Sequence, residues 1–196
     1  AQRFINSVLG ALIFVYAAQM LTKTEMGVYG SANMVYSIAT LVASLGLPTA
    51  ASWFTAYLMV KQRIAEARVI ARNIALITFA AASTLSFLLF LFSQDISQWM
   101  LGTREHAKTF QILSITALSM VLSSVLAGFL LGLQKFRQLA SIYLTAQTVR
   151  FALTVFLLTT GFGVASIFWG LSAYNLVIMA SALPLAFVTL HIHEGE

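Results

Sequence analysis

The chain of 196 residues lacks cysteine, has two prolines, and is only 9% charged. Without cysteine, neither a disulfide framework nor a thiolate metal site can form. Its three histidines, His106, His191 and His193, are too few and too scattered to build a zinc site, so we expect no metal and no cofactor. An average soluble domain carries roughly 25% charged residues. The scarcity of charge therefore argues against a water-soluble core.

Apolar residues dominate the composition of the chain. They make up 60% of the chain, and the mean hydropathy is +0.89. Because about 20 apolar residues cross a bilayer, a chain of this length holds at most about six or seven spans and no separate soluble domain. The predicted fold class is all-α, a polytopic transmembrane helix bundle forming one domain over 1–196. Six apolar runs predict the spans 4–21, 27–47, 73–92, 110–133, 139–160 and 164–190.

Local signals refine these spans. The first run resembles a signal peptide in following Arg3, but its length and the later spans favour a true helix. Gly46 and Pro48 predict a break where the second span ends. The charged segment 61–72 that follows is predicted to be a loop or an interfacial helix, and Pro184 is predicted to kink the last span.

Small residues recur every four positions in the fourth predicted span. Ser124, Gly128 and Gly132 would form a face along which another helix can approach closely. Such faces are common in membrane helices, so ordinary helix packing is the preferred interpretation.

The distribution of basic residues predicts an orientation. Arg3, four Lys or Arg residues in 59–72 and two in 134–138 fall on one predicted side, whereas Lys23, Arg104 and Lys108 fall on the other. Cytoplasmic loops retain positive charge, so both termini are predicted to face the cytoplasm, with the protein multi-pass in the cytoplasmic membrane. Because the basic residues that give the net charge of +5 lie between apolar runs, we interpret them as charges that orient the chain in the membrane. We therefore expect no nucleic-acid partner.

Arg150 is the one ionisable residue clearly inside a predicted span, about 18 Å beyond the preceding turn at ~1.5 Å per residue. Tyr143, Gln147, Arg150 and Thr154 share one helical face. An intramembrane arginine is costly and suggests function, here binding of an anionic group such as a phosphate. The alternative is a structural arginine bonded to helix carbonyls, or one nearer the interface.

Two uncharged polar residues complete the substrate-binding candidates. Asn33 belongs to a weaker polar face of the second span, and Gln19 lies in the first. Bonding between neighbouring helices explains such residues equally well.

Carboxylates are missing from every predicted span, because all six Asp and Glu residues fall in loops or at the terminus. A proton or sodium relay usually requires an intramembrane carboxylate, so no ion-coupling site is predicted. Paired carboxylates, a Ser/His/Asp set and a Gly-rich phosphate loop are also lacking. We therefore predict no catalytic residues and a protein that is not an enzyme.

Three segments at consecutive helix ends resemble one family. They are residues 21–30 (LTKTEMGVYG), 44–50 (SLGLPTA) and 128–136 (GFLLGLQKF). Their order and spacing are similar to those of the polysaccharide and oligosaccharide-lipid flippases, in the superfamily that also contains multidrug exporters and the lipid II flippase. The resemblance extends over essentially the whole chain.

This resemblance implies a bundle of about twelve to fourteen helices in two lobes that works by alternating access. The implied cargo is an anionic lipid-linked sugar pyrophosphate in a membrane-lipid environment, and Arg150 matches the arginines that family members often place in the cavity. The chain departs from the pattern at Gln19, where the family often has arginine, and at Thr22 and Lys23, which replace Gly-Pro. Six spans correspond to the N-terminal lobe, so the expected partner is a second lobe, either in a longer chain or in another chain.

Two further functions remain open at this stage. The chain is also compatible with a multidrug-type small-molecule exporter, although the missing carboxylates count against ion-coupled efflux. A non-transporting scaffold subunit of a membrane glycan-synthesis complex is the other alternative, because small-residue faces favour association between helices.

Overall fold

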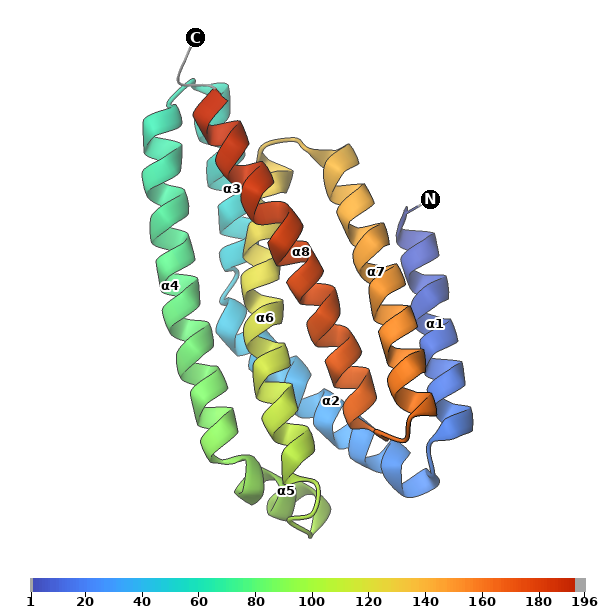
Figure 1. The fold of residues 1–196 in the computed structure, drawn as a ribbon. Helices are drawn as coiled ribbons and strands as arrows, with labels where there is room; N and C mark the ends of the chain where they lie inside the picture. Colours follow the sequence, from blue (N-terminus) through green and yellow to red (C-terminus); the bar gives the residue numbers. More distant parts are fainter. Residues whose placement is uncertain (1, 193–196) are drawn as a thin grey trace.

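The structure is a computed structural model that describes residues 2–192 and the side-chain surroundings of residues 7–186. Helices make up nearly all of it, and no strand occurs among residues 2–192 (Figure 1). The predicted all-α class is therefore confirmed. The helices in this range are α1 (Gln2–Met20), α2 (Lys23–Ser44), α3 (Leu47–Val60), α4 (Ile64–Leu91), α5 (Ser93–Leu101), α6 (Ala107–Gly132), α7 (Phe136–Thr159) and α8 (Ala165–Ile192).

Five helical segments are long and apolar enough to cross a membrane, and Ser7–Met20 of α1 forms a shorter apolar helix. Together they correspond to the six apolar runs of the sequence, which makes the chain a polytopic helical membrane protein. The long segments are Lys23–Val60, Ile64–Leu91, Ala107–Gly132, Phe136–Thr159 and Ala165–Ala186.

The second span is longer than the predicted 27–47, because α2 and α3 follow one another through a short break. Leu45 and Gly46 adopt left-handed backbone conformations with φ of 43° and 73°, and Pro48 stands in the first turn of α3. Proline fits a first turn because its missing N–H would have no helical partner there. The predicted break at Gly46 and Pro48 is confirmed, but the span resumes beyond it and ends at Val60.

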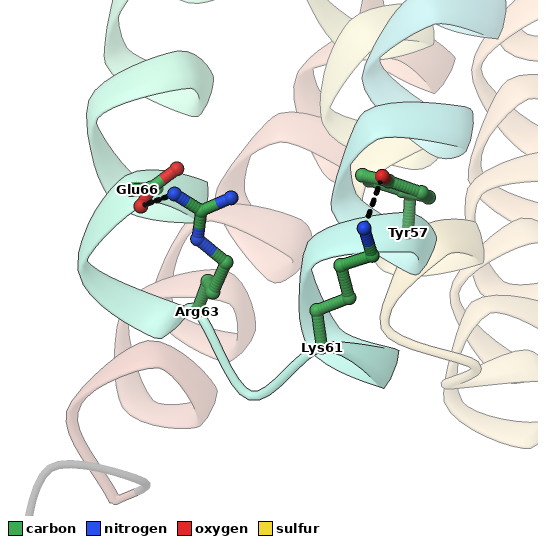
Figure 2. A network of polar contacts seen from close by, with 4 residues as sticks. All are labelled: Tyr57, Lys61, Arg63 and Glu66. Carbon is green, nitrogen blue, oxygen red and sulfur yellow. Dashed lines mark hydrogen bonds and ion pairs between the residues drawn. The ribbon is translucent and has the colours of Figure 1, made fainter.

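The segment 61–72, predicted to be a loop or an interfacial helix, is helical from Ile64 onward, so the loop alternative is wrong there. Only a short turn separates α3 from α4, which begins at Ile64 rather than near residue 73. Figure 2 shows how charge is accommodated there: Arg63 pairs with Glu66, and Lys61 donates to the Tyr57 hydroxyl. Long basic side chains can reach the membrane surface from a helix end, so charge did not mark the helix boundary.

The middle of the bundle is α6, which packs against α8, α3, α4, α2 and α5. In Figure 1 it lies between α4 and α8, while α7 and α1 form the far side of the molecule. A Cβ on Gly128 would lie 2.4 Å from the Pro48 carbonyl oxygen, and one on Gly132 would lie 2.6 Å from that of Ser52. The small-residue face predicted from Ser124, Gly128 and Gly132 is thus a packing surface, and its two glycines lie against α3.

The helices run alternately up and down the bundle. The start of α1, the α3–α4 turn and the α6–α7 turn lie at one end, and the α1–α2 turn, α5 and the α7–α8 turn lie at the other (Figure 1). Pro184 lies inside α8, which continues as one helix to Ile192, and the kink predicted there stays a prediction. Lys61 and Arg137 thus lie at the end opposite Lys23 and Arg104, as the pattern of basic residues predicts.

Candidate functional site

Arg150 lies in the interior of α7 and is partly buried. Beside it is a small cavity of about 30 Å³, which is room for a water molecule but for nothing much larger. The cavity is formed where α7 meets α1, α2 and α8. Its lining residues besides Arg150 are Gly10, Ile13, Phe14, Ala17, Met26, Tyr29 and Ile167.

Three tyrosines lie within electrostatic range of the guanidinium. Tyr29 and Tyr36 come from α2, and Tyr174 comes from α8. The Tyr29 ring also contacts Phe14 of α1 and Phe168 of α8, with ring centroids 6.5 Å and 6.1 Å away. The guanidinium of α7 therefore has tyrosines of two other helices in its vicinity.

The guanidinium has spare capacity for hydrogen bonding. Its Nε is buried and has no hydrogen-bond partner among the described residues. Arg150 forms no ion pair with any described residue, and the Arg63–Glu66 pair lies at the α3–α4 turn. Because a buried unsatisfied donor is costly, an anion with several acceptor oxygens would be stabilised here.

Hydrogen bonds between α6 and α8 hold one wall of this region in place. Thr116 and Ser172 are joined at 2.7 Å, and Ser123 donates to Asn175 Oδ1 at 3.0 Å. Asn175 also lies beside the Tyr36 hydroxyl of α2. The polar cluster, defined here as Arg150, Tyr29, Tyr36, Tyr174 and Asn175, thus joins α2, α7 and α8.

The other predicted residues of the Arg150 face have different surroundings. Gln147 is buried on α7, with 3% of its surface exposed. Tyr143 stacks on Tyr174, with ring centroids 6.4 Å apart and planes inclined by 12°, so it supports a tyrosine of the polar cluster. Thr154 is fully buried against Gly170 of α8. Its position is that of a packing residue between α7 and α8.

Asn33 and Gln19 are not brought to Arg150. Both side chains are exposed, and neither lines the cavity beside the guanidinium. The exposed Asn33 carbonyl accepts a hydrogen bond from Ser37 within α2.

Sequence reasoning missed Tyr29, Tyr174 and Asn175. A signal was present, since Tyr29 and Tyr36 are seven residues apart and so lie on one face of α2. Tyr174 and Asn175 interrupt the apolar run of α8. What the sequence could not show is that these faces of α2 and α8 turn toward α7.

The fold and the polar cluster together define a multi-pass helical membrane protein with an arginine inside its bundle. Residues 2–194 match the family model described as polysaccharide biosynthesis protein. The match covers nearly the whole chain, so the protein belongs to that family, and the family predicted from the three helix-end segments is confirmed. No curated protein and no solved structure matches the chain.

Proposed function

We propose that this chain forms one lobe of a transporter that moves a lipid-linked oligosaccharide or polysaccharide precursor across the cytoplasmic membrane by alternating access. Membership of the polysaccharide biosynthesis family and the apolar helical bundle support a polysaccharide-related membrane role. The single observation that carries the specific proposal is Arg150, with its unpartnered Nε, inside the bundle.

The chemistry of the polar cluster suits an anionic cargo. A guanidinium binds the oxygens of a phosphate bidentately, and nearby hydroxyls such as Tyr29 and Tyr36 can donate further hydrogen bonds. In a region of low dielectric, each of these bonds is stronger than in water. The cargo group is therefore proposed to be the pyrophosphate of a lipid-linked sugar.

Binding of such a cargo requires a change in shape. The cavity of about 30 Å³ beside Arg150 is far too small for a sugar pyrophosphate. Four of its lining residues come from α1, and α1 packs chiefly against α7. We propose that the cavity widens where α1 meets α7, facing a second lobe supplied by a longer chain or by a partner chain. No chemical step is proposed.

The test replaces Arg150 in a cell whose glycan export depends on this protein. Arg150→Gln is expected to lower export about 10- to 100-fold, because charged hydrogen bonds are worth about 1.5–3 kcal/mol, and Arg150→Lys should retain part of it. Arg137→Gln, at the exposed first turn of α7, is the matched control. Membrane levels of all variants are compared by immunoblot.

The outcomes separate the alternatives. Full export by Arg150→Gln at wild-type protein level would contradict the proposal. Efflux of a cationic dye from reconstituted vesicles would favour the multidrug-type exporter. Stable association with glycan-synthesis enzymes, without movement of a lipid-linked sugar in vesicles, would favour the scaffold.

A further inference from the structure

A groove runs along the outside of the bundle between α4 and α8, with α6 as its floor. It consists of two adjoining cavities of about 370 and 330 Å³, each within the size range of ligand pockets. They are continuous because Arg72, Ala75, Leu126, Phe129 and Leu183 line both. The groove lies on a different side of the bundle from the cavity beside Arg150.

The groove exists because one face of α4 carries only small side chains. Ala67, Ala71 and Ala75 recur every four residues and form one α4 wall with no side chain beyond Cβ. Leu126 and Phe129 of α6 form the floor. The lining is thus almost entirely apolar, as a hydrocarbon chain requires.

Its length matches half a membrane. The lining residues on α4 extend from Ala67 to Phe79, which is about 18 Å at ~1.5 Å per residue. One leaflet contributes about 15 Å of hydrocarbon to a bilayer. A single acyl chain of one leaflet would fit the groove from end to end.

The charge of the groove lies in the half nearer the α3–α4 turn. Arg68 and Arg72 are the charged residues that line the groove, and beyond Arg72, from Ala75 to Phe79, none of the lining residues is charged. Arg72 has an exposed side chain and forms no hydrogen bond or ion pair within the described part of the chain. The nearby Glu66 is engaged by Arg63 (Figure 2). The mouth of the groove is therefore positively charged.

From this geometry we infer that the groove binds an anionic phospholipid, with its phosphate at Arg68 and Arg72 and one acyl chain along α4. Basic clusters at the end of an intramembrane apolar groove attract anionic headgroups. An apolar helix of a second lobe would fill the groove but would offer no anionic group to Arg72. The inference does not depend on the transported cargo.

The first measurement is lipid retention by the purified full-length protein in detergent, followed by native mass spectrometry. The probes are phosphatidylglycerol and phosphatidylcholine with identical acyl chains. The wild type is expected to retain the anionic lipid preferentially. Since each arginine near a lipid phosphate contributes about a fivefold factor, the double variant Arg68→Gln/Arg72→Gln should lower that preference about 25-fold.

Matched variants separate the groove from charge in general. Lys135→Gln/Arg137→Gln removes the same charge at the same end of the bundle and should leave the preference unchanged. Ala75→Leu fills the groove without altering charge and should reduce retention, whereas Ala80→Leu, which does not line the groove, should not.

Several results would overturn the inference. Equal retention of the two lipids by the wild type would do so without any variant, so the test holds even if a variant fails to fold. Equal losses in the two double variants would also do so. A disulfide between two copies carrying Ala75→Cys would show that the groove is a contact between chains instead.

Discussion

Gly170 of α8 lies directly against Thr154 of α7, at the crossing that also holds Arg150. A Cβ at Gly170 would be 1.9 Å from Thr154 Oγ1 and 3.3 Å from the Arg150 carbonyl oxygen. Thr154 Oγ1 has no hydrogen-bond partner within the described residues, so removing this hydroxyl breaks no hydrogen bond there. The glycine sets how closely the two helices approach.

We therefore predict that Gly170→Ala destabilises the protein by about 1–3 kcal/mol, the usual cost of overpacking. Adding Thr154→Ala removes Oγ1, the atom with which the new Cβ clashes. The double variant should therefore regain at least half of the lost thermal stability in detergent. Gly30→Ala is the control, because a Cβ there meets nothing within 4 Å. A double variant no more stable than Gly170→Ala would show that the Thr154 hydroxyl is not the obstacle.

At the scale of single residues, the sequence predicted only part of the candidate site. Arg150 was found because charge inside an apolar run is conspicuous, and its depth follows from helix geometry. Thr154 was assigned to the same binding face because spacing cannot distinguish a residue that lines a cavity from one that faces a neighbouring glycine. Tyr174 was missed because nothing in α8 indicates that this face is turned toward Arg150.

At the scale of helices, α3 and α6 approach each other closely where Gly128 of α6 lies against the backbone of Pro48 in α3. Here the atoms facing Gly128 belong to the backbone of Pro48, which no side-chain change can trim. We predict that Gly128→Ala separates α3 from α6 and lowers the unfolding midpoint more than Ser124→Ala does. Ser124 is a suitable control since its hydroxyl bonds only within α6, to the Val121 carbonyl.

Unlike Gly170→Ala, this substitution should not be rescued by trimming a side chain of α3 such as Thr55, which faces Gly132 instead. The measurement is thermal unfolding of the purified variants in detergent. Equal stability of Gly128→Ala and the wild type would mean that α3 can move away from α6 without cost.

The ends of helices could be predicted where glycine or proline sets the backbone conformation. They could not be predicted where charged residues served as the only sign of a helix end. Gly46 and Pro48 marked the α2–α3 break because glycine readily adopts the left-handed conformation that ends a helix, and proline fits the first turn of the next one. The start of α4 was misplaced because arginines can belong to a helix that begins outside the hydrocarbon layer. The groove along Ala67, Ala71 and Ala75 was also invisible, since it depends on which face of α4 remains uncovered.

On the scale of the whole molecule, the alternation of the helices and the basic turns predict an orientation that labelling can test. The chain has no cysteine, so single cysteines can be introduced without background. Cysteines at Val60 and Gln138 lie at one end of the bundle, and those at Thr24 and Thr103 at the other. We expect a membrane-impermeant maleimide to label the second pair in intact cells and the first pair only after permeabilisation.

The opposite result would mean that the basic turns do not face the cytoplasm, contrary to the usual retention of positive charge. Labelling of one residue from each pair would contradict the topology itself, since the arrangement in Figure 1 places the members of a pair at the same end.

The partial exposure of Arg150 leads to the final prediction, because a guanidinium facing hydrocarbon is unfavourable and one facing a polar cavity is not. Gly10 lines the cavity beside Arg150, and a Cβ there meets nothing within 4 Å. A cysteine at Gly10 should react with a hydrophilic thiol reagent in the membrane, and a lipid-linked sugar pyrophosphate should slow that reaction. Val149 lies next to Arg150 at the same depth, is 37% exposed and does not line the cavity, so its cysteine should stay unreactive. Equal reactivity at the two positions would place Arg150 in a structural role rather than beside a cargo pathway.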